Sequence, residues 1–236
     1  MAVNLENLIK NQKENHFPAV PLEELDPLVR DKDVGITVEE LYSQTIPEYI
    51  LYDPEIVGYP DKEMQEDLYR WTLQEICPLT GFFSILDIGA GRGDLQKYIE
   101  RAYPEVMLQY HGIESNPNLI QAAETLGNRV VLGTFGKNEK DNIVEWAVCV
   151  GSLNEDYDMT GAKWDAFNNM LQKSLVSISK GIVFILLAED ADFVVYPIPE
   201  MVSYLAEKYP NIPFKIDYSK FNKIYKLTIF NEKYPE

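Results

Sequence analysis

The stretch of sequence with the clearest chemical potential is DIGAGRGD, which begins at Asp87 and carries Gly89, Gly91 and Gly93. It directly follows an apolar run. Glycines at this spacing allow a tight turn, and they let a ligand approach the backbone closely. Two ligand groups compete for such a turn: a pyrophosphate, or an ammonium group held by the acid.

The two aspartates around the glycines favour the ammonium. A dinucleotide site has the pattern G-x-G-x-x-G, and the following helix N-terminus faces a pyrophosphate. Here Asp94 stands where the third glycine of that pattern would be, and a carboxylate there repels a pyrophosphate. Asp87, two residues before the first glycine, suits a cation such as the ammonium of an amino acid. The glycines alone would admit both ligands.

A second acid follows at the end of the next predicted strand. The segment YHGIESNPNLI places Glu114 23 residues after Gly91. Two carboxylate oxygens match the two adjacent hydroxyls of a ribose, as in dinucleotide sites. Taken alone, Glu114 could also be an acid that stabilises a helix start.

Together these motifs resemble class I S-adenosylmethionine (SAM)-dependent methyltransferases. ILDIGAGRGDL is similar to motif I of that family, and GIESNPNLI is similar to its second motif. The resemblance is closest to small bacterial and bacteriophage methyltransferases. It implies that the glycines wrap the methionine part of SAM, that Asp87 holds its ammonium, and that Glu114 accepts hydrogen bonds from the ribose.

The resemblance also implies a larger set of cofactor contacts. At the third strand, Thr134 stands where many relatives have an aspartate for the adenine amino group, and Phe135 could cover the adenine ring. This departure puts the adenine contacts in doubt, not the cofactor. The predicted cofactor-binding residues are Asp87, Gly89, Ala90, Gly91, Gly93, Glu114, Ser115, Thr134, Phe135, Gly151 and Ser152.

The end of the fourth predicted strand faces the transferring methyl group in that family. Here it reads VCVGSLNEDYD, with no Asp/Asn-Pro-Pro-aromatic motif and no Pro-Cys nucleophile of base methyltransferases. Asn154 could orient a nucleophile, and Asp156 or Glu155 could accept its proton, although a solvated acidic loop explains the acids equally well. We therefore predict Asn154 and Asp156 as catalytic residues.

Three functions remain open at this point. The first is methyl transfer to an unidentified acceptor, with a small molecule or a protein favoured over nucleic acid. The second is a SAM-binding structural or regulatory component of a larger assembly, with little or no catalysis. The third, disfavoured by Asp94 and by the C-terminal hairpin, is an NAD-dependent dehydrogenase.

The elements that must position these residues alternate between strand and helix. This alternation predicts a doubly wound α/β fold: a seven-stranded, mostly parallel sheet with helices on both faces and a C-terminal antiparallel hairpin. The expected strands are 82–88, 106–114, 129–135, 142–152, 181–188, 213–219 and 223–230, and the expected helices are 61–76, 93–103, 117–127, 162–179 and 198–209.

Composition narrows the expected setting. We expect residues 1–60 to be an N-terminal extension or lid, which could bind a protein partner, and 61–236 to be the SAM-binding domain. The net charge of −17 argues against non-specific nucleic-acid binding, and Lys215, Lys220, Lys223 and Lys226 read as a solvated hairpin face. No apolar run could span a membrane, no signal peptide or metal-ligand cluster is visible, and two cysteines fit a cytoplasmic location.

Overall fold

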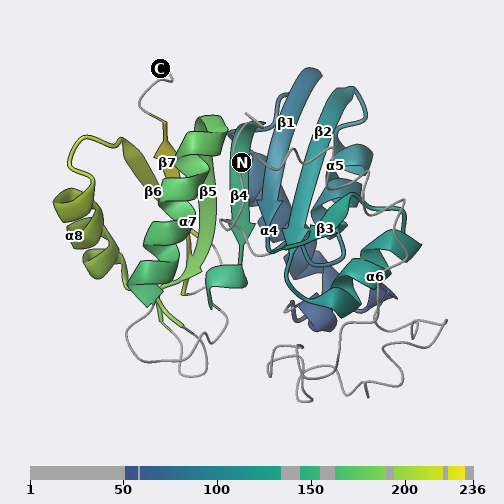
Figure 1. The fold of residues 1–236 in the computed structure, drawn as a ribbon, viewed down its shortest axis with the longest axis horizontal. Helices are drawn as coiled ribbons and strands as arrows, with labels where there is room; N and C mark the ends of the chain where they lie inside the picture. The colour runs from purple at the N-terminus through teal and green to yellow at the C-terminus, as the bar shows by residue number, and fades with distance from the viewer. Residues whose placement is uncertain are drawn as a thin grey trace.

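The computed structural model describes residues 51–57, 59–133, 144–154, 163–189, 194–219 and 223–231. They form one seven-stranded sheet in the order β3-β2-β1-β4-β5-β7-β6 (Figure 1). Neighbouring strands from β3 to β5 pair in parallel, and β7 is antiparallel to both β5 and β6. The predicted fold class is confirmed, including the C-terminal antiparallel hairpin.

The strands follow the apolar runs of the sequence. The central ones are buried on both faces, as a parallel sheet between two helix layers requires. The strands are β1 (Gly81–Ile88), β2 (Val106–Glu114), β3 (Val130–Leu132), β4 (Val144–Val150), β5 (Ile178–Leu187), β6 (Phe214–Tyr218) and β7 (Ile224–Phe230).

The helices begin where the sequence offers caps. The Asp61 carboxylate accepts the Met64 N–H at the start of α4, and Asn116 caps α6 one residue before Pro117. The helices are α4 (Lys62–Leu73), α5 (Asp94–Ala102), α6 (Pro117–Thr125), α7 (Lys163–Ser177) and α8 (Ile198–Lys208), with short 3-10 turns η3 (Pro54–Val57) and η4 (Ser152–Asn154).

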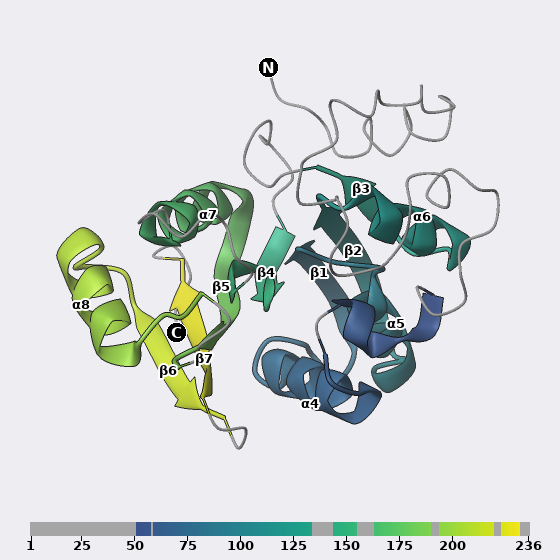
Figure 2. The ribbon, with the colours of Figure 1, turned by 90° about the horizontal axis from the view of Figure 1, so that it is seen from below.

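Two hydrophobic cores lie on the two faces of the sheet. On one face, α4, α5 and α6 pack against strand residues such as Ile85 and Val183. On the other face, α7 and α8 pack against Leu86, Ala147 and Phe184. Figure 2 shows α4 and α7 on opposite sides of the strands. All of the parallel strands therefore present their carboxyl ends at one edge, between the two helix layers.

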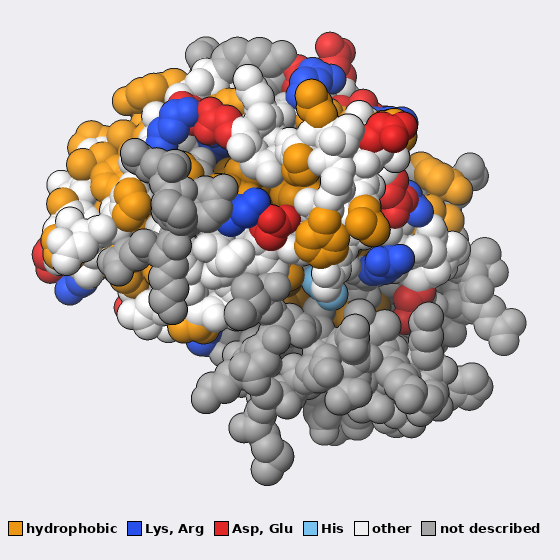
Figure 3. All heavy atoms as spheres, turned by 90° about the horizontal axis from the view of Figure 1, so that it is seen from above, with side chains coloured by type: hydrophobic (Ala, Val, Ile, Leu, Met, Phe, Trp, Pro, Cys, Tyr) orange, Lys and Arg blue, Asp and Glu red, His pale blue; other side chains and the backbone are white. Residues whose placement is uncertain are grey.

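The other end of the sheet, where the parallel strands begin, exposes apolar side chains. Phe82 and Met107, which are register partners at the amino ends of β1 and β2, are 51% and 67% exposed. Seen from this side, the described surface mixes hydrophobic side chains with acidic and basic ones (Figure 3).

Some predicted boundaries were wrong. The helix expected to reach residue 179 ends at Ser177, and β5 begins immediately at Ile178 rather than at Gly181. The Asn231 side chain, from the end of β7, donates to the carbonyls of Leu175 and Ile178 and so holds this helix-to-strand join. The hairpin-face interpretation was also wrong for Lys226, which is buried.

The predicted division at residue 60 stays a prediction, because residues 1–50 lie outside the described part of the chain. None of the helices in that described part combines the length and the apolar character needed to cross a membrane.

Candidate functional site

The glycine turn joins the end of β1 to the start of α5. Gly89, Gly91 and Gly93 all have positive φ angles, of 72°, 55° and 78°, which a side chain would strain. The N–H groups of Gly89 and Ala90 donate to the carbonyl of Ile113 at 2.9 and 3.0 Å, so the turn is bonded to the end of β2. The turn is thus a fixed backbone structure between two strand ends.

Protein side chains approach each glycine closely. A Cβ placed on Gly89 would overlap Ser152, and one on Gly93 would lie 2.8 Å from the Cβ of Asn128. A Cβ on Gly91 would lie 3.1 Å from Cγ1 of Val57. The glycine requirement therefore comes from packing within the chain as well as from the φ angles.

Asp87 is a buried carboxylate near the end of β1, two residues before the first glycine of the turn. Its side chain accepts a hydrogen bond of 2.5 Å from the Tyr110 hydroxyl, across the β1–β2 pair. Burial raises the pKa of Asp87 to about 7; the Tyr110 bond opposes this rise, while the carboxylates of Glu114 and Asp94 add to it. A cation beside Asp87 would remove much of this cost.

Glu114 lies beside the same turn at the end of β2. One carboxylate oxygen accepts the Gly91 N–H at 2.9 Å, and the other accepts the N–H groups of Ser115 and Asn116, each at 2.8 Å. Both roles considered for Glu114 are therefore compatible with its contacts. Its carboxylate bonds the backbone just before α6, and it also faces the glycine turn.

Asp94 begins α5, as expected, but its carboxylate has a partner that the sequence did not suggest. Its Oδ2 accepts hydrogen bonds from Nε and Nη2 of Arg92, at 3.1 and 2.8 Å, and from Gln65 at 3.2 Å. The charge that we expected to repel a pyrophosphate is paired with an arginine. The preference for a cation consequently depends on Asp87 and not on Asp94.

The end of β4 closes the site from the other side. Gly151 has a φ of 88° and leads into η4, where the Ser152 hydroxyl donates to the carbonyl of Ile88 at 3.1 Å and lies 3.0 Å from the sulfur of Cys149. Ala90 is buried in the turn. The structure thus brings together Asp87, Gly89, Ala90, Gly91, Gly93, Glu114, Ser115, Gly151 and Ser152 at the ends of β1, β2 and β4.

The remaining predicted residues are not placed. Thr134, Phe135 and Asp156 lie outside the described residues; Asn154 ends η4, but its side chain is not described. Three residues of the site were not expected from the sequence: Tyr110, which bonds Asp87; Arg92, which pairs with Asp94; and Val57, which lies against Gly91. Only Arg92 had a usable signal, since it lies between two glycines of the motif. Among the described residues, no group of His, Cys, Asp and Glu could hold a metal ion.

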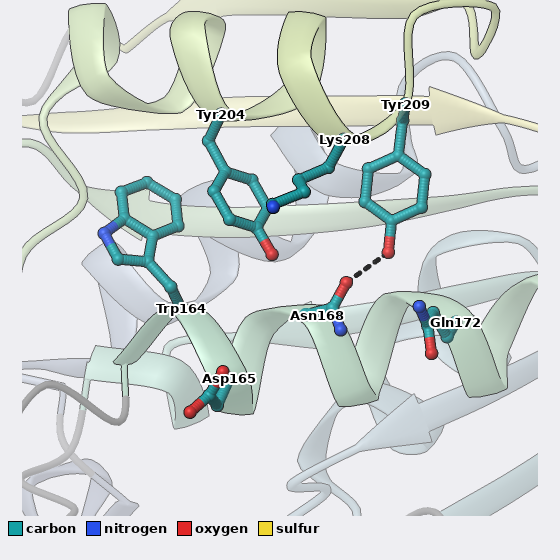
Figure 4. Close-up of a pocket in the computed structure, with 7 residues that line it drawn as sticks. All are labelled: Trp164, Asp165, Asn168, Gln172, Tyr204, Lys208 and Tyr209. Carbon is teal, nitrogen blue, oxygen red and sulfur yellow. Dashed lines mark hydrogen bonds between the residues drawn. The ribbon is translucent and has the colours of Figure 1, made fainter.

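A separate groove of about 360 Å³ lies between α7 and α8 (Figure 4). The rings of Trp164 and Tyr204 are stacked there with centroids 4.5 Å apart, and the Tyr209 hydroxyl donates to Asn168. No residue of the glycine turn lines it. We therefore keep the groove apart from the candidate site.

Comparison with known proteins supports the fold. No family model matches the sequence, and no curated protein matches it. Among solved structures, the chain is similar to a SAM-dependent methyltransferase from Aquifex aeolicus (TM-score 0.53, 16% identity, 76% of this chain and 99% of that one).

Two further solved structures are similar to the chain. One is the magnesium protoporphyrin IX methyltransferase of Synechocystis PCC 6803 with bound SAM (TM-score 0.53, 10% identity, 98% and 99% coverage). The other is a SAM-dependent methyltransferase from Clostridium acetobutylicum (TM-score 0.54, 12% identity, 76% and 96% coverage). With its strand order and its glycine turn, the chain has the fold of class I SAM-dependent methyltransferases.

Proposed function

We propose that the chain binds SAM at the glycine turn. The observation that carries this proposal is the pair of buried carboxylates, Asp87 and Glu114, on adjacent strand ends around Gly91. A buried acid whose pKa is raised by burial gains most from a cationic partner, and the ammonium of SAM is one. Glu114 presents acceptor oxygens of the kind that hold ribose hydroxyls.

The proposed reaction is transfer of the SAM methyl group to an acceptor. Bound SAM supplies an electrophilic methyl on a sulfonium. The chain would contribute position and exclusion of water, with Asn154 orienting the nucleophile and Asp156 accepting a proton where one must leave. A net charge of −17 favours a small molecule or a protein as acceptor over nucleic acid.

Calorimetric titration of the whole chain tests the binding step. SAM and S-adenosylhomocysteine should bind, and NAD should not. Glu114→Ala should weaken both by about tenfold or more, because hydrogen bonds to a charged acceptor are lost, whereas Glu124→Ala, an exposed acid on α6, is the matched control. Absence of binding by both sulfur compounds would refute the proposal.

Turnover distinguishes an enzyme from a binding component. Release of S-adenosylhomocysteine, measured with pools of small molecules and of proteins as acceptors, should exceed the rate without acceptor. Tight SAM binding with no acceptor-dependent release would instead support the structural or regulatory role.

A further inference from the structure

The segment that precedes α4 lies on the glycine turn. Val57, at the end of η3, is the nearest side chain to the position that a Cβ would take on Gly91, at 3.1 Å. The Tyr59 N–H donates to the Pro54 carbonyl at 3.1 Å, and the Tyr59 ring packs edge-on against Tyr69 of α4, with centroids 5.9 Å apart. We call residues 53–57 together with Tyr59 the strap.

One side chain of the turn holds the strap in place. Arg92 is only 2% exposed, and its Nη1 donates to the backbone carbonyl of Asp53 at 3.0 Å. Its other two nitrogens donate to Asp94, and its own carbonyl accepts from Asn128 at 2.6 Å. A buried guanidinium with a carboxylate partner is rigid and strongly bonded. Its bond to Asp53 therefore fixes the strap relative to the glycines.

The strap and Glu114 meet at the same residue. The Gly91 N–H donates to Glu114, while Cγ1 of Val57 lies 3.1 Å from the position that a Cβ would take on Gly91. A ligand that reaches the backbone of Gly91 and the carboxylate of Glu114 needs the space beside this glycine. In this structure, Val57 occupies that space on the side where a Cβ of Gly91 would stand.

We propose that Arg92 is a positioning residue that latches the strap over the glycine turn, so that the strap must move away before the cofactor contacts Gly91. This inference rests on the proposed SAM site. The latched form is a closed state, and apparent affinity falls in proportion to the fraction of molecules that are open. Weakening the latch should therefore raise the affinity for cofactor, although it removes stabilising contacts.

Two variants weaken the latch in different ways. Arg92→Lys keeps a positive charge for Asp94, but the three donors of its ammonium start from one nitrogen and cannot reproduce the separate positions from which Nη2 and Nη1 of Arg92 reach Asp94 and Asp53. Val57→Ala leaves Arg92 intact and removes the side chain over Gly91. Matched controls are Arg101→Lys, whose residue is exposed and paired with Glu66, and Val202→Ala, on the exposed side of α8.

The experiment titrates S-adenosylhomocysteine into each full-length variant and measures its thermal unfolding. Arg92→Lys and Val57→Ala should each lower the Kd about fivefold, the effect of losing roughly one hydrogen bond or one small apolar contact, while the unfolding temperature falls. The controls should stay within twofold of wild type. A residue that merely supports the fold would give a weaker Kd together with the lower unfolding temperature, so an unchanged or increased Kd overturns the latch.

Amide hydrogen exchange separates this inference from the proposed function. Without any ligand, the Tyr59 amide should exchange faster in Arg92→Lys than in wild type or in Arg101→Lys. Faster exchange in a chain that binds neither SAM nor S-adenosylhomocysteine would leave Arg92 as the holder of the strap and refute the cofactor site. Unchanged exchange would refute the latch whatever binds.

Discussion

Two strands of the same sheet each bury a charged side chain toward α4, and the two sites are built in opposite ways. Lys226 of β7 is 1% exposed; its Nζ lies 3.5 Å from Asp217 and 3.9 Å from Glu75, donates to the Trp71 carbonyl at 3.3 Å, and lies over the Trp71 ring. Asp87 of β1 has a tyrosine hydroxyl as its partner and two further carboxylates nearby.

The difference separates a structural charge from a charge prepared for a ligand. Lys226 and its neighbour Lys215 balance the charges of Glu75 and Asp217, so these ion pairs tie the end of α4 to the terminal hairpin. The two charged groups that act on the pKa of Asp87, Glu114 and Asp94, have the same sign as its carboxylate, and burial raises this pKa to about 7. A buried group that destabilises its own protein is a frequent sign of a functional site.

The pH dependence of stability should show the largest effect. The pKa of Asp87 is about 7 in the folded chain and about 3.8 in the unfolded one. The folded state therefore binds more protons between these values, and the stabilisation from the protonated carboxyl, at most about 4 kcal/mol, is lost as pH rises from about 4 to about 7. Denaturant unfolding of wild type and Asp87→Asn should diverge over this range, with the variant more stable at pH 8. If the free energies of unfolding of the two proteins changed with pH in parallel, the raised pKa of Asp87 and its contrast with Lys226 would both be contradicted.

Lys226→Met should lower the free energy of unfolding by at most about 3 kcal/mol, because it leaves the partly exposed carboxylates of Asp217 and Glu75 without their cation. The matched change Lys215→Met, at a side chain 46% exposed, should cost under about 1 kcal/mol. Neither should alter the affinity for S-adenosylhomocysteine more than twofold. A loss of binding in Lys226→Met alone would erase the distinction between the two sites.

Asp87→Asn should show the opposite of Lys226→Met: a weaker affinity for the cofactor without a loss of stability. At pH 7.5 it should weaken SAM binding by about thirtyfold, the effect of losing a charge-assisted hydrogen bond, with no loss of stability. Glu100→Gln, at an exposed acid of α5, is the control for a lost negative charge. Equal affinity of wild type and Asp87→Asn in calorimetry would remove Asp87 from the site.

Tyr110→Phe should give the smallest effect. Removing the hydroxyl takes away the hydrogen bond that opposes the rise in the pKa of Asp87, so this pKa should rise further. Near pH 7 more of Asp87 would be protonated, and SAM affinity should fall by about threefold, with recovery at pH 8. A loss of affinity that is the same at both pH values would indicate a packing defect instead.

The architecture could be predicted from the sequence because each strand and helix carries its own local signal. Apolar runs identified β1 and β2, and Asp61, Asn116 and Pro117 lie at the expected helix starts. The start of β5 could not be predicted, since α7 continues into the strand with no Gly or Pro between them and Asn231, which holds the join, comes much later in the chain.

The site could be predicted only in part, for a related reason. Asp87 and Glu114 end adjacent strands, so their proximity follows from the β–α–β order. The contacts of Arg92 with Asp53 and of Gly91 with Val57 join residues 39 and 34 positions apart, and residues 53–57 carry no strand or helix pattern that would place them in advance. Tyr110 reaches Asp87 because of the β1–β2 register, which the sequence does not state.

The contact of Ser152 with Gly89 makes these two positions dependent on each other in evolution and in design. Any side chain at position 89 meets Ser152, so even asparagine, which tolerates a positive φ, should fail there on its own. Pairing that change with Ser152→Gly should restore part of the lost stability. Chains of this fold that carry a larger residue at the position of Gly89 should therefore have a smaller residue at the position of Ser152. A library that varies only one of the two positions should not recover such pairs.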